Sequence, residues 1–165
     1  MLLDRDGTLN EDRRDSVTSP DQLVMIPGAA EAVARLTRAG VAVALVTNQA
    51  NIGRGVIDEA ALERIHDKLR REIARAGGKL DSIFICPDAP ERATERRKPG
   101  PGMLREALAH FAARAADTPM IGDSLKDLEA GKAAGCPRIL VRTGKGRATE
   151  ATGLPPRVLP VAVYD

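Results

Sequence analysis

Two carboxylates stand close together near the start of the chain. Asp4 and Asp6 follow an apolar stretch, residues 1–3, that is typical of the end of a buried strand, and Gly7 comes directly after them. Alternate residues of a strand share a face, and the glycine indicates a sharp turn, so we expect both carboxylates at the end of the strand. Two such anions repel each other unless a cation joins them, and Mg²⁺ prefers oxygen ligands. The alternative is a strand followed by an ordinary Asx-type turn.

Three further groups of polar residues follow predicted strands or open predicted helices. They are Thr47 with Asn48, Arg97 with Lys98, and Asp123 with Asp127. In an open α/β sheet such positions converge on one edge. Carboxylates there could bind a metal ion, and a hydroxyl and an ammonium group could bind phosphoryl oxygens. No segment matches the phosphate-binding loop of the P-loop nucleotide hydrolases.

The composition is that of an ordinary folded protein. Of 165 residues, 43% are hydrophobic and 29% are charged, which predicts one domain spanning residues 1–165. A net charge of +2 and an aromatic content of 2% argue against a nucleic-acid partner. No apolar run is long enough to span a membrane, and two cysteines suggest no disulfide framework. We therefore expect a cytoplasmic protein, and a monomer.

Predicted strands alternate with predicted helices along the chain. Apolar runs predict strands at residues 41–46, 80–86, 119–121 and 139–141, and helical spacing of apolar residues predicts helices at 29–39, 59–76, 103–111 and 125–134. This order indicates an α/β fold, a doubly wound, Rossmann-like parallel sheet in three layers. Residues after Arg142 are predicted to form a loop. Residues 161–165 predict a strand that runs into nothing, so both ends of the chain look clipped.

Four short motifs, in order along the chain, resemble those of the haloacid dehalogenase (HAD) superfamily. They are Asp-Arg-Asp-Gly-Thr at 4–8, Thr-Asn-Gln at 47–49, Lys-Pro at 98–99 and Gly-Asp-Ser-Leu-Lys-Asp at 122–127. No insertion is long enough for a separate cap domain. With Thr-Asn-Gln-x-x-Ile-x-Arg-Gly and Arg-Lys-Pro-x-Pro-Gly-Met, the chain looks most like the capless D-glycero-D-manno-heptose 1,7-bisphosphate 7-phosphatase family. The histidinol-phosphate phosphatases are its near neighbours.

The resemblance implies a phosphatase that works in two steps. Asp4 would be the nucleophile that forms an aspartyl-phosphate, and Asp6 would be the general acid and then the general base. Thr47 and Lys98 would hold the phosphoryl oxygens, and Lys98 would also offset the charge of Asp4.

The same resemblance implies Mg²⁺ as the cofactor. Its ligands would be the carboxylates of Asp4 and Asp123 and the backbone carbonyl of Asp6. Asp127 lies one helical turn after Asp123 and would orient Lys98 or a water ligand. The alternative is that Asp123 caps a helix and Asp127 is a residue on its surface.

The substrate implied is a small phosphosugar for lipopolysaccharide or capsule synthesis. In the heptose family an arginine of the second motif and the Arg-Lys pair contact the phosphosugar, and the matching residues here are Arg54, Arg97 and Lys98. We expect Asn48 and Asn51 to bind the substrate beside them. For Arg54 the alternative is a solvated loop arginine.

One segment departs from the family pattern. Relatives usually carry a structural zinc site, Cys-x-His followed by Cys-x-Cys, before Arg-Lys-Pro. Here Cys86 matches the first ligand, but Asp88 replaces the histidine, and Glu95 and Arg96 lie in the region of the later cysteines. Structural zinc takes four ligands, so we predict no zinc site and a buried thiol at Cys86. The loop at 87–102 would instead be held by ion pairs among its own charged residues: Glu91, Arg92, Glu95, Arg96 and Arg97.

Three other functions stay open. A histidinol-phosphate phosphatase would apply the same chemistry to another leaving group. A polynucleotide 3′-phosphatase has a similar second motif, although the charge and aromatic content argue against it. A non-catalytic phosphosugar-binding module is the third, and the complete set of motif residues argues against it.

The two histidines are not expected to take part in the chemistry. His66 and His110 both fall on predicted helices, far from the motifs. We expect each to be an ordinary, partly exposed helix residue.

Overall fold

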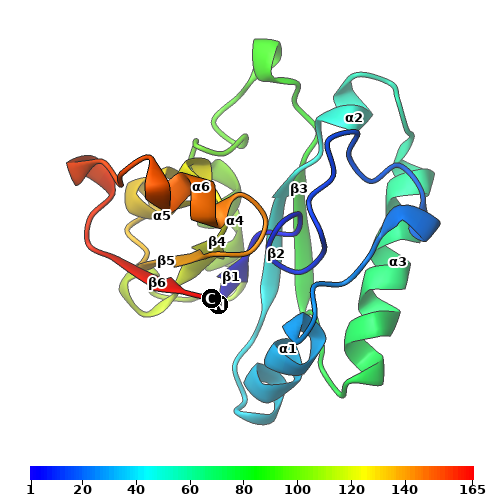
Figure 1. The fold of residues 1–165 in the computed structure, drawn as a ribbon, viewed down its shortest axis with the longest axis horizontal. Helices are drawn as coiled ribbons and strands as arrows, with labels where there is room; N and C mark the ends of the chain where they lie inside the picture. Colours follow the sequence, from blue (N-terminus) through cyan, green and yellow to red (C-terminus); the bar gives the residue numbers. More distant parts are fainter.

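A six-stranded parallel sheet forms the centre of the protein (Figure 1). The computed structural model describes residues 1–165. The strands, in chain order, are β1 (Leu2–Leu3), β2 (Ala44–Asn48), β3 (Ser82–Cys86), β4 (Met120–Gly122), β5 (Arg138–Val141) and β6 (Val161–Tyr164). Their order in the sheet is β3-β2-β1-β4-β5-β6, so β1 lies at the point where the order reverses. Open parallel sheets bind ligands at this point, outside the carboxyl ends of the strands.

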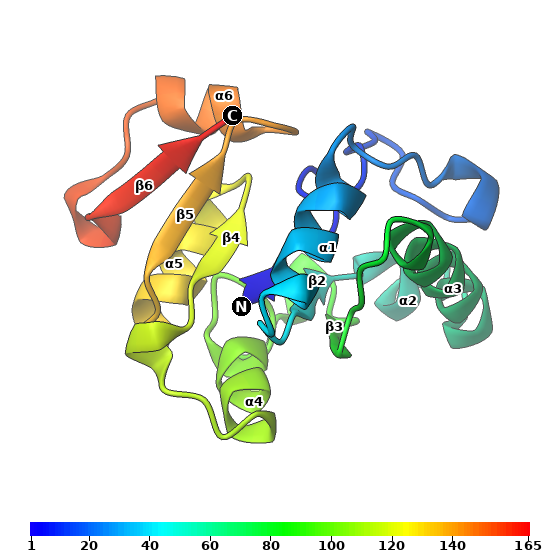
Figure 2. The same ribbon diagram turned by 90° about the horizontal axis from the view of Figure 1, so that it is seen from below.

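Helices cover both faces of the sheet, which gives three layers (Figures 1 and 2). The helices are α1 (Ala29–Arg38), α2 (Ala50–Gly53), α3 (Glu59–Arg75), α4 (Gly102–His110), α5 (Leu125–Ala134) and α6 (Gly146–Ala151). Short 3₁₀ turns are η1 (Pro20–Gln22), η2 (Pro90–Arg92), η3 (Ala115–Asp117) and η4 (Pro156–Val158). Helices α1 and α3 pack on one face, and α4 and α5 pack on the other. The predicted fold class is confirmed.

The sheet separates two apolar cores, and the two residues of β1 contribute to one each. Leu2 packs with residues of α4 and α5, whereas Leu3 packs with residues of α1 and α3. Successive strand residues point to opposite faces, so a strand of two residues is enough to join both cores. This short strand carries Asp4 and Asp6 directly beyond its end.

Long connections run from the carboxyl ends of β1 and β3. Residues 4–28 contain only the turn η1, and residues 87–101 contain only the turn η2. Neither connection forms a further sheet or helical bundle over the site. The structure contains no helix with the length and apolar character needed to cross a membrane.

Strand β2 begins three residues later than the sequence predicts. It runs over Ala44–Asn48 instead of 41–46 because its ladder begins where Leu2 of β1 pairs with Ala44. Thr47 and Asn48 are therefore the last residues of the strand itself. Their positions are fixed by pairing with Ile85 and Cys86 of β3.

The carboxyl-terminal quarter also differs from the prediction. Residues after Arg142 contain α6, which has only six residues and one buried position, too little for an apolar period to reveal. Residues 161–164 form β6, which pairs in parallel with all of β5. The strand that the sequence predicts at 161–165 is thus confirmed over Val161–Tyr164.

We predict that Leu69→Ala lowers the free energy of unfolding by about 2–5 kcal/mol, because the side chain is fully buried between α3 and the sheet. Urea denaturation followed by circular dichroism measures this loss. Val56→Ala is the matched control, since Val56 is 59% exposed and its loss should change stability by no more than about 0.5 kcal/mol. A loss below about 1 kcal/mol at Leu69 would contradict the assigned packing.

Candidate active site

One pocket brings together every residue that the motifs single out. It opens at the carboxyl ends of the central strands, has a volume of about 270 Å³, and only one of its eighteen lining residues is hydrophobic. The predicted residues among them are Asp4, Asp6, Thr47, Asn48, Asn51, Arg54, Arg97, Lys98, Asp123 and Asp127. Such a lining suits a small, highly charged ligand rather than an apolar one.

A buried lysine occupies the floor of this pocket. Lys98 is 2% exposed, and its Nζ lies 2.8 Å from Asp4 Oδ1 and 2.6 Å from Asp127 Oδ1. Burial alone would lower the pKa of Lys98, but the Asp127 and Asp4 carboxylates outweigh burial and raise it. The ammonium group therefore stays charged.

Asp127 is a buried residue of the first turn of α5. Its Oδ2 accepts hydrogen bonds from Ser124 N (3.1 Å) and Ser124 Oγ (2.6 Å), and its Oδ1 accepts from Lys98. Ser124 and Asp127 thus form a capping box. The alternative of a surface helix residue is wrong, because Asp127 is 1% exposed.

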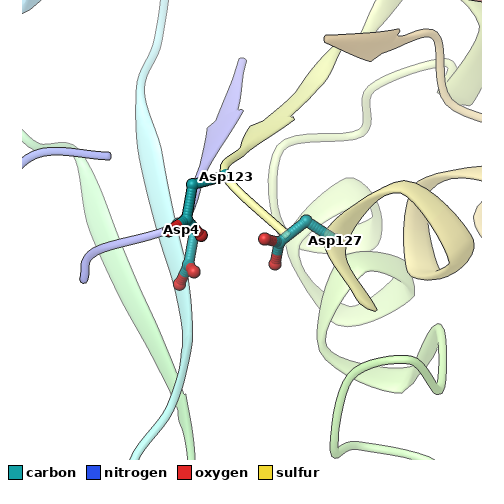
Figure 3. A group of neighbouring side chains, drawn as sticks. All are labelled: Asp4, Asp123 and Asp127. Atoms are coloured by element: carbon teal, nitrogen blue, oxygen red, sulfur yellow. The ribbon is translucent and has the colours of Figure 1, made fainter. Parts of the chain in front are cut away.

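Asp4 and Asp123 are the carboxylates that fit a metal ion. Oxygens of Asp4, Asp123 and Asp127 all lie within 4.8 Å of one another, and Asp127 projects from α5 toward the other two (Figure 3). Asp4 Oδ2 and Asp123 Oδ1 have no hydrogen-bond partner, whereas both oxygens of Asp127 are engaged. Burial raises the pKa of Asp4 to about 7, against the effect of Lys98, and that of Asp123 to about 6. A cation would favour the ionised form of both, and carboxylate oxygens suit Mg²⁺.

A tight approach of two glycines fixes Asp123. Gly7 has a φ of +82°, and a Cβ there would overlap Asp123 Oδ2 and press on Gly144. This contact brings the loop after β5 close enough for Lys145 N to donate to Asp123 Oδ2 at 2.7 Å. Lys145 Nζ in turn pairs with Asp12 Oδ2 at 2.8 Å. The sequence predicts a loop here but not its contact with Asp123, for which the pair of glycines after the strand is the only signal.

Asp6 is held by three side chains. Arg5 donates from Nε (3.1 Å) and Nη2 (2.9 Å) to Asp6 Oδ1, and from Nη2 (2.9 Å) to Oδ2. Asn10 Nδ2 donates to Oδ1 at 2.9 Å, and Gln49 Nε2 donates to Oδ2 at 3.1 Å. Burial would raise the pKa of Asp6, but these donors outweigh it and hold the pKa below its ordinary value. Sequence reasoning missed these roles, although all three residues lie in or beside the motifs.

His66 is not the partly exposed residue that the sequence predicts. It is 2% exposed, and its Nε2 lies 3.3 Å from Arg5 Nη1. Helix α3 thus reaches the site through a residue whose partner is far away in the sequence. His110 is exposed at the end of α4, as expected, with Nε2 at 3.1 Å from Ser82 Oγ.

The loop after β3 is held differently from the prediction. Asp88 Oδ2 accepts hydrogen bonds from Thr94 N (2.8 Å) and Oγ1 (2.5 Å), and Arg97 Nη1 donates to the Asp88 carbonyl at 2.6 Å. The expected ion pairs within the loop are not made. Arg96 pairs instead with Glu106 on α4 at 2.7 Å, because α4 packs directly beneath this loop. Cys86 is fully buried, as predicted.

The end of the same loop is tied to β2 by Asn48. Its Nδ2 donates to the Lys98 carbonyl at 3.0 Å, and its Oδ1 accepts from Lys98 N at 3.1 Å. The amide therefore fixes the backbone of Lys98. Asn51 and Arg54 lie on the pocket wall, and Arg54 Nη2 is 3.9 Å from Glu91 Oε2.

We predict that His66→Gln removes the contribution of His66 to the pH dependence of stability between pH 6.5 and pH 4. Burial, reinforced by Arg5, lowers the pKa of folded His66 to about 3, whereas its ordinary value is 6.5. At His66 the unfolded chain therefore binds more protons in this window, so the stability that the neutral ring contributes is full above pH 6.5 and is lost as the pH falls toward 3. One proton corresponds to a slope of about 1.4 kcal/mol per pH unit.

The measurement is the free energy of unfolding in urea at pH 7, 6 and 5. Besides Arg5, the charged groups of Arg70, Asp6 and Asp67 act on the His66 ring. His110→Gln serves as the control and should keep the wild-type slope. An unchanged slope in His66→Gln would contradict a buried neutral ring.

Comparison with known proteins identifies the family. The HAD-hydrolase-like family matches residues 95–164. The D-glycero-beta-D-manno-heptose-1,7-bisphosphate 7-phosphatase of Bordetella bronchiseptica is 46% identical over 93% of this chain and 86% of its own length, and that of Pseudomonas aeruginosa is 43% identical over 94% and 87%. The crystal structure of D,D-heptose 1,7-bisphosphate phosphatase from B. bronchiseptica, complexed with magnesium and phosphate, matches with a TM-score of 0.93 and 45% identity over 99% of this chain and 90% of that one. The chain belongs to the D-glycero-D-manno-heptose-1,7-bisphosphate 7-phosphatase family of HAD-like hydrolases.

Proposed function

We propose that the protein removes the 7-phosphate of D-glycero-β-D-manno-heptose 1,7-bisphosphate by way of an aspartyl-phosphate. The observation that carries this proposal is the pocket itself. It combines an unpartnered Asp4 oxygen, a buried Lys98 and a second free carboxylate oxygen at Asp123. The names of the relatives at 43–46% identity support the substrate.

In the first step, Asp4 is the nucleophile. Its Oδ2 has no hydrogen-bond partner, whereas Lys98 and Arg5 N hold its Oδ1. The oxygen attacks phosphorus as the bond from phosphorus to the sugar oxygen breaks. Lys98, held in turn by Asp127, and Thr47 stabilise the charge that develops on the phosphoryl oxygens.

Asp6 transfers protons in both steps. It gives a proton to the departing sugar oxygen and later takes one from the water that hydrolyses the aspartyl-phosphate. Its lowered pKa keeps Asp6 ionised, which is the form that can accept a proton in the second role. For the first role, a substrate phosphate dianion nearby raises the carboxyl pKa and so favours the protonated form.

Mg²⁺ is the proposed cofactor, and Asp4, Asp123 and the backbone carbonyl of Asp6 would hold it. Asp123 Oδ1 is free for this ion, and Asp4 would bind it through the carboxylate oxygen that does not attack phosphorus. Bound there, Mg²⁺ would offset the charge of the phosphoryl group. Asp127 supports the site through Lys98 instead, because both of its oxygens are engaged.

Cationic side chains at the pocket mouth would bind the rest of a bisphosphate. Arg54 and Arg97 line the pocket beside Asn51, as do Lys126 and Lys145. A second phosphate bound among them would favour a bisphosphate over a monophosphate. Asn48 acts through the Lys98 backbone that it fixes.

We expect Mg²⁺-dependent phosphate release to be fastest with the β-anomer of the heptose bisphosphate. Histidinol phosphate and a 3′-phosphorylated oligonucleotide, assayed side by side, test the alternative substrates. A preference for either would keep the chemistry and reassign the substrate. No release from any of them, by folded protein with Mg²⁺ present, would leave only the binding module.

Asp4→Asn should lower kcat by at least about 10³-fold, because removal of an enzyme nucleophile has an effect of this order or larger. Asp15→Asn is the matched control, since Asp15 is an exposed carboxylate that pairs only with Arg13. Phosphate release from the heptose bisphosphate is the measurement. Equal activity in Asp4→Asn and wild type would exclude the aspartyl-phosphate route.

Elemental analysis of the purified protein should find no stoichiometric zinc. Cys86 is a single buried thiol whose pKa burial raises, and the neighbouring Asp88 is bonded to Thr94. Treatment with EDTA should abolish activity, and Mg²⁺ alone should restore it. One zinc ion per chain, or restoration that needs zinc, would contradict the proposed metal content.

A further inference from the structure

A line of buried contacts runs from helix α3 to Asp6. His66 Nε2 lies 3.3 Å from Arg5 Nη1, and the same guanidinium group donates from Nε and Nη2 to Asp6. Arg5 has no exposed surface, and His66 is 2% exposed. Neither side chain lines the pocket, so neither can touch the substrate.

Arg5 uses all three of its side-chain nitrogens in this arrangement. Two of them grip the Asp6 carboxylate, and the third faces His66. A guanidinium group is planar, so fixing one nitrogen and the stem fixes the directions of the other two. The bidentate contact then sets the plane of the carboxylate. His66 therefore limits how Asp6 can rotate, through Arg5.

The chemistry of the contact requires an acceptor on α3. A guanidinium group has only donors, so His66 Nε2 accepts and the ring proton lies on Nδ1. Without this acceptor, a buried N–H of Arg5 would have no partner. The guanidinium group would then be expected to rotate toward another acceptor. Glutamine can offer an amide oxygen near the position of Nε2, whereas leucine fills similar space without any acceptor.

We propose that Arg5 and His66 are positioning residues that set the orientation of Asp6 for proton transfer. This inference rests on the role of Asp6 as acid and base under the proposed function. Asn10 and Gln49 also hold Asp6, but each gives it one hydrogen bond. Arg5 gives it three, and only Arg5 is braced from a second element of the fold.

Alkyl and aryl phosphates should depend differently on the orientation of Asp6, because their leaving groups differ in the need for a proton. A sugar alkoxide departs only with a proton, so its release depends on the orientation of Asp6. p-Nitrophenolate departs readily without one. The value of kcat/KM reports formation of the aspartyl-phosphate. Loss of the contact between His66 and Arg5 should therefore reduce kcat/KM far more for alkyl than for aryl phosphates.

The experiment compares His66→Leu, His66→Gln and the exposed control His110→Leu. In His66→Leu, kcat/KM for the heptose bisphosphate should fall at least about tenfold more than for p-nitrophenyl phosphate, since a positioned general acid contributes roughly 10²- to 10⁴-fold. Inhibition by inorganic phosphate should keep its Ki, because the phosphoryl-binding groups are untouched. His66→Gln should recover most of the loss, and His110→Leu should match the wild type.

Arg5→Lys provides a second test that does not alter α3. It keeps the positive charge beside Asp6 but removes the fork, so it should show the same selective loss for alkyl phosphates. Thermal melting of each variant establishes that it is folded. If His66→Leu does not fold, the comparison of Arg5→Lys and His66→Gln with wild type decides the question.

An equal loss for both substrate types in His66→Leu and Arg5→Lys, with no recovery in His66→Gln, would overturn the inference. A wild type that hydrolyses other alkyl phosphates but not the heptose bisphosphate would overturn the proposed substrate alone. The alkyl-to-aryl ratio would then be measured with fructose 1,6-bisphosphate, and the same outcomes would apply.

Discussion

One ammonium group buried between two carboxylates determines how the rest of the site is built. Lys98 contacts Asp4 at the end of β1 and Asp127 at the start of α5, so it joins the two elements that flank the pocket. Removing one member of such a buried pair typically costs about 3–5 kcal/mol, because the remaining charge has no partner. The two ion pairs of the Lys98 side chain therefore hold the loop that carries it. Asn48 holds the same residue through two hydrogen bonds to its backbone.

The carboxylates around Lys98 outnumber the cations, which leaves negative charge that a metal ion could neutralise. Asp4, Asp123 and Asp127 crowd within 4.8 Å, yet the only buried cation among them is Lys98. Burial raises the pKa of both Asp4 and Asp123, and a divalent cation bound between them would favour their ionised forms. Asp6 does not depend on Lys98 for a counter-charge, because it forms its own ion pair with Arg5. The carboxylates proposed to bind the metal ion and the carboxylate proposed to transfer protons thus lie in different electrostatic surroundings.

The sequence predicted the fold class and the gathering of the motif residues at one edge of the sheet, because both depend on local patterns. Alternating apolar runs revealed a parallel sheet, and the spacing of Asp4, Thr47, Lys98 and Asp123 after strand ends revealed one rim. His66 was misjudged because its partner, Arg5, lies 61 residues away, and no local pattern reports a contact of that kind. The helix α6 was missed because six residues with one buried position carry no readable period. The loop contacts of Arg96 depended on where α4 would lie, which is a property of the packed structure.

The pocket has a buried floor and an exposed rim, and the two parts differ in how firmly their charged side chains are held. Lys98 and Asp127 on the floor are almost fully buried, as is Arg5 behind Asp6, and each has its partners in place before any substrate arrives. Such preorganised groups stabilise a transition state without having to rearrange during the reaction. The rim cations Arg54, Lys126 and Lys145 are exposed, and the contact of Arg54 with Glu91 is long, at 3.9 Å. Exposed ion pairs of this kind contribute little to stability, about 0–1 kcal/mol, so rim residues can change without disturbing the fold. Substrate preference in a capless phosphatase of this architecture can therefore vary at the rim, while the chemistry stays fixed on the floor.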